Sequence, residues 1–312
     1  MKIAYLIIAH TDVAQFNRLI NALYVENVTD FYIHIDQKVD DTPFKSTVKN
    51  RRNIYFTTKR AFMQWAGYSM CKCQRYLLEE MLTKRIEYDR IICLSGLDYP
   101  IASNEEIIGF FSNQNNQKEY IAGQNQKELI APEWIHQKIE VYHFFRDLRI
   151  QNRKVRRIFS GAARTIMTLL PFRKKRYIVV NGKQEDVYAG SCWWGITYPC
   201  ACYVYDKMKN EKAYENYFKY SFAPDEMMIQ TIVFNSPFAK HAILIDKKEE
   251  ENNLEAMAPL SYFVYRGAIK IWSTEEDYRT LVNSGKLFCR KIVSNQSETV
   301  ISLIDTHRNE KK

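Results

Sequence analysis

The first third of the chain alternates short apolar runs with segments whose apolar residues recur at helical spacing. We predict strands at 3–9, 30–36, 53–57 and 90–94, and helices at 14–23 and 67–83. Strands that alternate with helices are joined by crossover connections, which make them parallel members of one sheet. The chain is therefore predicted to adopt an α/β fold, with a mostly parallel central sheet and helices on both faces.

The second half of the chain is less regular and is interpreted as α+β additions to that sheet. The pattern predicts a hairpin turn at Asn181-Gly182, a strand at 191–197, and helices at 199–205 and 213–218. Pro224 and the two acids after it are favourable start signals for another helix, which is predicted to run to Ile232. The polar end from Asp305 onward is expected to fray.

The composition is typical of a well-packed globular protein, with 46% hydrophobic residues and only 10 Gly and 8 Pro in 312 residues. No apolar stretch approaches the ~18 residues needed to span a bilayer, and the first apolar run is too short for a signal peptide. The seven Cys have no C-x-x-C spacing, so we interpret them as reduced thiols of a cytoplasmic protein. The chain lacks a P-loop and a Gly-x-Gly-x-x-Gly motif, which argues against an NTPase or a dinucleotide enzyme.

Positive charge is concentrated in one segment, at about 146–176. It contains eleven basic residues against the single acid Asp147 and carries +10, whereas the whole chain carries +9. Apolar residues are interleaved with the cations, as in amphipathic segments that bind membrane surfaces. We rank peripheral contact with anionic lipid first, a nucleic-acid patch second and a solvated loop third. Nucleic acid is not expected as a partner, because the chain contains no recognition module for it.

Three carboxylates have the placement expected of a ligand site in this fold class. Asp36 and Asp98 terminate predicted parallel strands, and Glu226 begins a predicted helix. Ligands of open α/β sheets bind outside the carboxyl ends of the strands, so these side chains would share a crevice. Each acid also has an ordinary structural explanation. Asp36 could simply keep a strand end soluble, Asp98 could form the turn after Ser95-Gly96, and Glu226 could be a charge favoured at a helix N-terminus.

The chain contains no Asp-x-Asp pair, the motif that often holds a divalent ion against the diphosphate of a nucleotide sugar. A bound diphosphate would then have to be neutralised by cations, through charge-assisted hydrogen bonds from Arg or Lys. Arg266, Arg290 and Lys291 stand in apolar sequence contexts, where a merely solubilising charge is less expected. They are the candidate cations, and no metal site is predicted.

Seven short motifs together resemble those of one enzyme family. They are Ile3-Ala4-Tyr5 with Ala9-His10, Ile33-His34-Ile35-Asp36, Trp65-Ala66-Gly67, Ser95-Gly96-Leu97-Asp98-Tyr99-Pro100-Ile101, Gly190-Ser191 with Trp193-Trp194, Pro224-Asp225-Glu226, and Leu287-Phe288-Cys289-Arg290-Lys291. With them the chain resembles the core-2/I-branching β-1,6-N-acetylglucosaminyltransferases and their peptide xylosyltransferase relatives, in a short bacterial form. The resemblance implies one GT-A-like domain over residues 1–312. Within it we expect a nucleotide-binding half at about 1–125, a basic insertion at about 146–176, and an acceptor and catalytic half at about 177–300.

The same resemblance implies an inverting, metal-independent transfer of a sugar, first of all N-acetylglucosamine, from a UDP-sugar to a glycan hydroxyl. Glu226 resembles the general base of that reaction. The donor-binding residues that the motifs imply are Ile8, Asp36, Asp98, Arg266, Arg290 and Lys291. The implied acceptor-binding residues are Glu140, Trp193, as a stacking wall, and Asp225. No cofactor is implied besides the donor substrate.

Animal members of the family carry an N-terminal membrane anchor and disulfides, whereas this chain starts at the first strand of the catalytic fold. We therefore expect a cytoplasmic protein that segment 146–176 holds peripherally at the inner membrane face, where it acts on a glycan or lipid-linked glycan. Two alternatives stay open. One is transfer of xylose or another sugar from its UDP donor, and the other is a non-catalytic protein of this fold that binds membrane or nucleic acid.

Overall fold

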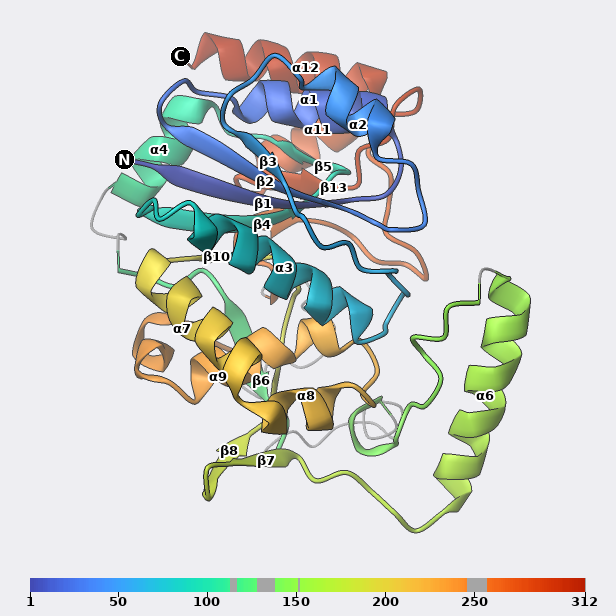
Figure 1. Ribbon diagram of the computed structural model, residues 1–312. Coiled ribbons are helices and arrows are strands. Elements are labelled where there is room, and N and C mark those ends of the chain that lie inside the picture. The colour runs from blue at the N-terminus through green and yellow to red at the C-terminus, as the bar shows by residue number, and fades with distance from the viewer. Residues whose placement is uncertain (113–116, 128–137, 151, 246–256, 312) are drawn as a thin grey trace.

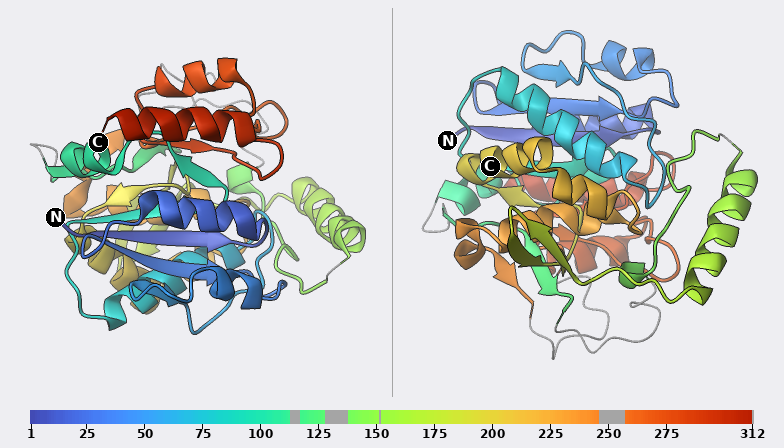
Figure 2. Two further views of the ribbon diagram at one scale, coloured as in Figure 1. Left: turned by 90° about the horizontal axis from the view of Figure 1, so that it is seen from above. Right: turned by 60° about the horizontal axis from the view of Figure 1, so that its bottom comes forward.

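The computed structural model describes residues 1–112, 117–127, 138–150, 152–245 and 257–311. Figure 1 shows a central sheet with helices on both sides and one long helix, α6 (Arg153–Leu169), beside the body. The two further views in Figure 2 show the same separation of α6 from the rest of the protein.

The central sheet has five strands in the order β10-β4-β1-β2-β3. The parallel strands are β1 (Ile3–Ala9), β2 (Thr29–Ile35), β3 (Ile54–Phe56) and β4 (Arg90–Ser95), and β10 (Gly195–Ile196) joins β4 as an antiparallel edge. All residues of β1, β2 and β4 are buried, as expected of a parallel sheet covered on both faces. The four strands predicted for the first third, and the mostly parallel α/β sheet, are confirmed. The assignment to the GT-A type stays a prediction.

Alternate residues of β1 pack against different helices. Ala4, Leu6 and Ile8 belong to the core formed with α3 (Ser69–Thr83), α7 (Tyr198–Asn210), α8 (Lys212–Phe218) and α9 (Met228–Phe234). Ile3, Tyr5 and Ile7 belong to the core formed with α1 (Val13–Leu23), α2 (Thr42–Thr47) and α4 (Asn104–Ser112). The helices predicted at 14–23, 67–83, 199–205 and 213–218 are therefore present, each within a few residues of its expected bounds.

Short strands build three smaller units around the central sheet. One sheet joins β12 (Ser261–Tyr262), β13 (Phe288–Arg290) and β5 (Asp98–Pro100), and another joins β11 (Ile243–Leu244), β6 (Ala122–Asn125) and β9 (Tyr188–Ala189). The third unit is the hairpin of β7 (Tyr177–Val180) and β8 (Lys183–Asp186). Its turn residues Asn181 and Gly182 have φ values of 50° and 80°, so the predicted hairpin turn is confirmed.

Two predictions for the second half were wrong in part. The strand predicted at 191–197 is reduced to β10, because the Ser191 hydroxyl accepts a hydrogen bond from Trp193 N (3.2 Å) and turns the backbone locally. The helix predicted after Pro224 is interrupted: η1 (Pro224–Glu226) ends at Met227, whose φ of −135° is not helical, before α9 begins. A further 3₁₀ turn, η2 (Pro237–His241), follows α9.

The polar C-terminal region is ordered, contrary to the expected fraying. After α11 (Glu275–Val282), helix α12 (Glu298–Glu310) packs on the body. Its buried Arg308 donates hydrogen bonds to Ala102 O (2.9 Å) and Ala22 O (2.7 Å). Tyr99 also donates to Asp305 Oδ1 at 2.8 Å. These polar side chains serve as tertiary contacts, which their hydrophilic character alone does not indicate.

Helix α6 is the least covered element of the body. Asn152 caps it by accepting hydrogen bonds from Lys154 N (3.0 Å) and Val155 N (3.3 Å). From Lys154 to Leu169, every side chain is half-buried or exposed. Within the part of the chain that the structure describes, no helix combines the length and apolarity needed to cross a bilayer.

Candidate active site at the carboxyl edge of the central sheet

The ends of β1, β2 and β4 form a closely packed edge. Asp36 N donates to Ala9 O (3.0 Å), and Gly96 N donates to Ile8 O (2.9 Å). A Cβ at Gly96 would lie 2.8 Å from the Ala9 Cβ, so only glycine permits this approach of the two strand ends. The Ile8 side chain is buried in the core, and its carbonyl is already hydrogen-bonded to Gly96. Ile8 therefore shapes this edge from within.

Asp36 is held rigidly at the end of β2. Its Oδ1 accepts hydrogen bonds from Lys38 N and Met63 N, both at 3.1 Å, and its Oδ2 lies 3.2 Å from Lys38 Nζ. The side chain is 5% exposed, so a donor would meet Asp36 together with the more exposed Lys38.

His10 extends the same edge and connects it to the candidate cations. Burial lowers the pKa of His10; the charge of Asp36 raises it, and the charges of Lys38, Lys291 and Arg290 lower it. Since these groups all act on one imidazole, the structure brings the end of β2 and the end of β13 to one place. His10 and Lys38 were not among the predicted site residues, although both directly follow a predicted strand end.

Asp98, at the start of β5, is enclosed in the protein and contacts Arg290. Its side chain is fully buried and accepts hydrogen bonds from Ser95 N (2.8 Å) and Arg290 Nη1 (3.0 Å). Burial raises the pKa of Asp98, while the Arg290 charge and the Ser95 N–H lower it. Asp98 therefore contacts Arg290, and its assignment to the donor side stays a prediction.

Arg290 and Lys291 place two adjacent cations beside an aromatic wall. The Arg290 guanidinium lies 4.6 Å from the centre of the Trp193 ring, so Trp193 supports the cation as well as facing the site. Burial lowers the pKa of Lys291, and the neighbouring charge of Arg290 lowers it further. Among the described residues, Lys291 has no carboxylate partner. A pair of like charges in this setting favours a bound anion.

Arg266, the third predicted cation, is not part of this pair. It lies in an exposed turn closed by the bridge between Tyr265 and Ile269, where its backbone N–H donates to Ala268 O (3.0 Å). Its assignment to the donor site stays a prediction that no contact of the structure supports.

Asp225 and Glu226 lie in the short turn η1 but have different surroundings. The Glu226 carboxylate is 39% exposed and forms an ion pair with Lys138 Nζ at 2.9 Å. Asp225 is buried, and within the described residues its Oδ1 has no hydrogen-bond partner. Burial and the adjacent charge of Glu226 raise the pKa of Asp225 to about 7. Glu226 is thus accessible and held by an ion pair, while Asp225 is enclosed.

Gly190 fixes the position of this turn. Its N–H donates to Glu226 O (2.8 Å), and a Cβ at Gly190 would lie 2.1 Å from Ala122 O. A larger residue would push the 190–194 loop away from β6 and would break the hydrogen bond between Gly190 N and Glu226 O. The Gly190-Ser191 motif therefore acts through backbone position.

Cys192 shows that the two sides of the site meet. Burial raises the pKa of this thiol, the charges of Asp225 and Glu226 raise it further, and the charge of Arg290 lowers it. Cys93, on β4, is likewise within electrostatic reach of Asp98, Asp225 and Arg290. The accessible carboxylate and the paired cations thus converge on the loop that carries Trp193.

Aromatic residues form an exposed surface next to η1. Trp65 is 72% exposed and stacks edge-on against Phe222, with ring centres 5.5 Å apart. Ala223 N donates to Ala66 O (3.1 Å), which joins the Trp65-Ala66-Gly67 motif to the residue before Pro224. This surface has the form that sugar rings stack on, and it lies close to the Glu226 turn.

Glu140 is engaged with the end of the basic segment. Its Oε1 accepts a hydrogen bond from Arg176 Nε (2.7 Å), and its backbone carbonyl accepts one from Lys174 N (2.8 Å). The side chain is 25% exposed, and its assignment as an acceptor contact stays a prediction. Residues 134–137 of the stretch from which Glu140 was predicted lie outside the described residues. Lys138, two residues before Glu140, was missed because a single Lys next to Gln137 carries no sequence signal of its own.

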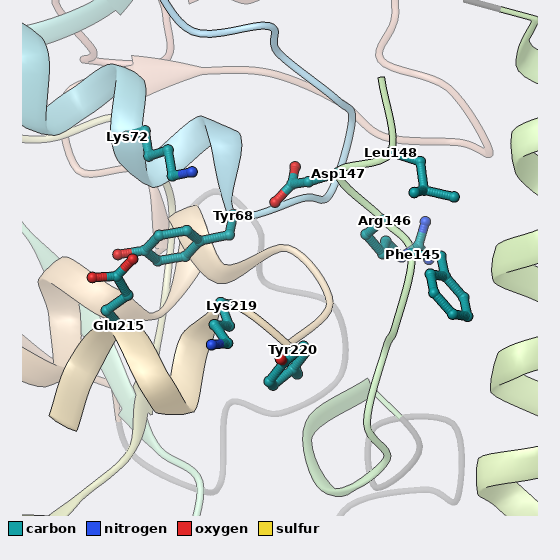
Figure 3. Close-up of a pocket in the computed structure, with 9 residues that line it drawn as sticks. All are labelled: Tyr68, Lys72, Phe145, Arg146, Asp147, Leu148, Glu215, Lys219 and Tyr220. Atoms are coloured by element: carbon teal, nitrogen blue, oxygen red, sulfur yellow. The ribbon is translucent and has the colours of Figure 1, made fainter. Parts of the chain in front are cut away.

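A cavity of about 290 Å³ lies beside the aromatic surface, between α3, α8 and the 145–148 segment (Figure 3). Tyr68 and Lys72 come from the α3 side, Glu215 and Lys219 from the α8 side, and Arg146 from the segment that leads to α6. The cavity is thus next to the predicted acceptor side and not at the strand ends.

The described residues contain no group of three or more His, Cys, Asp or Glu side chains arranged to hold a metal ion. Metal independence nevertheless stays a prediction, since activity alone tests it.

Comparisons with known proteins agree on one family. A family model described as Core-2/I-Branching enzyme matches residues 3–249. Xylosyltransferase 2 of Rattus norvegicus is 25% identical over 322 residues, which cover 98% of this chain and 34% of the rat protein. The beta-1,3-galactosyl-O-glycosyl-glycoprotein beta-1,6-N-acetylglucosaminyltransferase 4 of Mus musculus is 23% identical over 312 residues, which cover 94% of this chain and 62% of the mouse protein. The chain therefore spans about a third of the rat relative and less than two thirds of the mouse relative.

A solved structure of a cytidylyltransferase from Leptospira borgpetersenii covers 100% of this chain and 95% of its own, with 12% sequence identity and a TM-score of 0.36. A score this low carries no argument about the fold.

Proposed function

The chain belongs to the Core-2/I-branching enzyme family, and we propose that it is an inverting glycosyltransferase that uses UDP-N-acetylglucosamine as its donor. The observation that carries this proposal is the loop at 190–193, whose Gly190 N donates to Glu226 O (2.8 Å) and whose Trp193 ring lies 4.6 Å from the Arg290 guanidinium. Transfer of a sugar needs a base beside the acceptor hydroxyl and positive charge beside the leaving diphosphate. The two kinds of group come to this loop from separate elements of the second half of the chain, η1 and β13.

In the proposed reaction, Glu226 acts as the general base. Its carboxylate accepts the proton of the acceptor hydroxyl while that oxygen attacks the anomeric carbon of the donor sugar. The new carbon–oxygen bond forms on the face opposite the breaking bond to the diphosphate, so the anomeric configuration inverts. The partial exposure of Glu226 and its ion pair with Lys138 support this role, because the carboxylate is both reachable and held in place.

Arg290 and Lys291 stabilise the departing UDP in this proposal. Asp98 and the Trp193 ring hold the Arg290 guanidinium in position, and Lys291 has no competing carboxylate among the described residues. Asp36 and its neighbours at the end of β2 would bind the uridine half, in keeping with ligand binding at strand ends. No metal takes part in the proposed step; we expect activity to persist in EDTA, and a complete loss that Mn²⁺ restores would refute this point.

The acceptor is proposed to be a glycan or a lipid-linked glycan. Trp65 and Trp193 supply aromatic rings for sugar stacking in this proposal, and Glu140 and Asp225 are the predicted carboxylates of the acceptor side. Xylose is the second candidate for the transferred sugar, because the rat relative that covers nearly all of this chain is named a xylosyltransferase. Comparing turnover of UDP-N-acetylglucosamine with that of UDP-xylose separates the two candidates.

The substitution Glu226→Gln tests the proposal directly. It keeps the shape of the side chain but removes the base, so we expect turnover of the donor to fall about 10³-fold while UDP binding, measured by calorimetry, is retained. Glu79→Gln is the matched control, because Glu79 also pairs with a lysine, Lys59 at 2.7 Å, but lies outside the site. Turnover in Glu226→Gln equal to that of the control would refute the assignment and would favour a non-catalytic role.

A further inference from the structure

Helix α6 exposes large apolar side chains that a water-soluble surface normally covers. Ile158 is 69% exposed, Phe159 53%, Ile166 59% and Leu169 82%. Phe172, just after the helix, is 65% exposed. These five residues belong to one continuous part of the chain, beside the body in all three ribbon views (Figures 1 and 2). A surface of this kind marks an interaction site.

The apolar and charged residues of α6 occupy different sides of the helix. At 100° per residue, Val155, Ile158, Phe159, Ile166 and Leu169 fall on one continuous side. Lys154, Arg157 and Arg164 fall on the other side, and all three are exposed. No Asp or Glu occurs between Asp147 and Glu185. The helix is thus apolar on one side, cationic on the other and free of acids along its whole length.

The half-buried residues of α6 all lie outside its apolar side. Arg156, Ser160, Ala163 and Met167 are half-buried and recur at intervals of four, three and four residues. They mark the flank of the helix that is turned toward the body, so the apolar side is left without a partner in the described structure. The body adds to the positive field there: burial lowers the pKa of Arg146 to about 10, and the charges of Arg164 and Arg156 also lower it.

We propose that α6 is an interfacial helix that binds an anionic lipid surface, with its apolar side in the acyl boundary and its cations at the headgroups. The apolar side of α6 matches the acyl chains of such a surface, and its Lys and Arg side chains match the anionic headgroups. A second copy of the chain fits less well, because α6 carries no Asp or Glu that could pair with the cations of a second α6. Membrane binding by α6 is independent of the proposed function.

The test is co-sedimentation of the full chain with phosphatidylcholine vesicles, with and without phosphatidylglycerol. We expect binding only when phosphatidylglycerol is present, and we expect it to weaken as salt is raised. Two double variants separate the contributions of apolar surface and of charge to vesicle binding. Ile158→Gln with Leu169→Gln removes apolar surface without changing the charge. Lys154→Gln with Arg157→Gln removes charge without changing the apolar side. Each is expected to lower the bound fraction about tenfold or more.

The matched control is Lys49→Gln with Arg52→Gln, which removes the same charge from exposed residues after α2 and should leave vesicle binding unchanged. Since the substituted residues of α6 are exposed, circular dichroism melts of all variants should match the wild type. Phe159→Trp adds a direct readout, because brominated lipids should quench the new fluorophore on anionic vesicles. Three results would overturn the proposal: undiminished binding by the apolar variant, an equal loss in the control, or a sedimentation dimer that the apolar variant dissociates without any vesicle binding.

Discussion

Asp98 and Asp225 are two buried aspartates within electrostatic reach of the same thiol, Cys93, yet the charges that face them have opposite signs. Asp98 receives a guanidinium hydrogen bond from Arg290 and a backbone hydrogen bond from Ser95. The charge of Glu226 raises the pKa of Asp225 and that of Lys138 lowers it less, and the Oδ1 of Asp225 has no partner within the described residues. The two carboxylates are similarly buried. They differ because a positive charge offsets the buried charge of Asp98, whereas Asp225 faces a negative one.

This difference indicates two kinds of role. A buried carboxylate with a well-placed guanidinium is a structural element that fixes the geometry of its partner. A buried carboxylate that faces a like charge lowers stability, and such groups gather at functional sites. We therefore assign Asp98 to the positioning of Arg290, and Asp225 to the site itself. Three substitutions test this comparison.

Arg290→Met should have the largest effect, because it leaves the fully buried Asp98 without its counter-charge. We expect the free energy of unfolding to fall by about 3–5 kcal/mol at pH 7. Since the loss of Arg290 raises the pKa of Asp98 further above its unfolded value, the variant should lose stability as pH rises from about 4. Urea denaturation at pH 5 and pH 8 measures both effects. Arg279→Met, which breaks an exposed pair with Glu275, is the control and should change stability by less than about 0.5 kcal/mol.

Asp225→Asn should have an intermediate effect of the opposite sign. The pKa of Asp225 is raised to about 7 in the folded protein, against about 4 when unfolded, so its ionisation costs stability as pH rises from about 4 to about 7. We expect the variant to gain about 2 kcal/mol at pH 8 and little at pH 4, again by urea denaturation. Its turnover should fall even though its stability rises. A variant that is less stable than wild type at pH 8 would contradict the comparison.

Lys138→Met should have the smallest effect on stability. The pair that it breaks is exposed, with 28% of Lys138 and 39% of Glu226 accessible, so we expect a change below about 0.5 kcal/mol. Turnover should nevertheless fall, by about tenfold, because Glu226 loses the ammonium group that orients its carboxylate. Unchanged turnover together with unchanged stability would show that this ion pair has no part in the reaction.

Much of the central sheet could be predicted from the sequence, because its signals are local. The apolar runs of β1 and β4 are continuous, and the helices in this part of the chain have regular spacing, so both type and order follow from periodicity. The turn at Asn181-Gly182 was predictable for the same reason, since these two residues accept positive φ. The GT-A-like architecture and the boundaries of the functional halves rest on resemblance and stay predictions.

The pairings within the site could not be predicted in this way. Asp98 looked like a ligand because an acid at a strand end is exposed in most sheets, but its partner Arg290 lies 192 residues later in the chain. The contact between Lys138 and Glu226 spans 88 residues and leaves no local pattern. The contacts of Arg308 were not predicted, since nothing in a polar segment indicates which cation will donate to Ala22 and Ala102. Tertiary structure decides these roles.

The pairing of β5 with β13 also constrains when the enzyme can become active during its synthesis. β1 to β5 leave the ribosome early, whereas β13 and then α12, with Arg308, come among the last elements. Domains fold as their parts become available, and contacts distant in sequence form late. A nascent chain that has passed β5 therefore holds Asp98 without its guanidinium, and the Asp98–Arg290 pair forms only when translation has delivered the strand that carries Arg290.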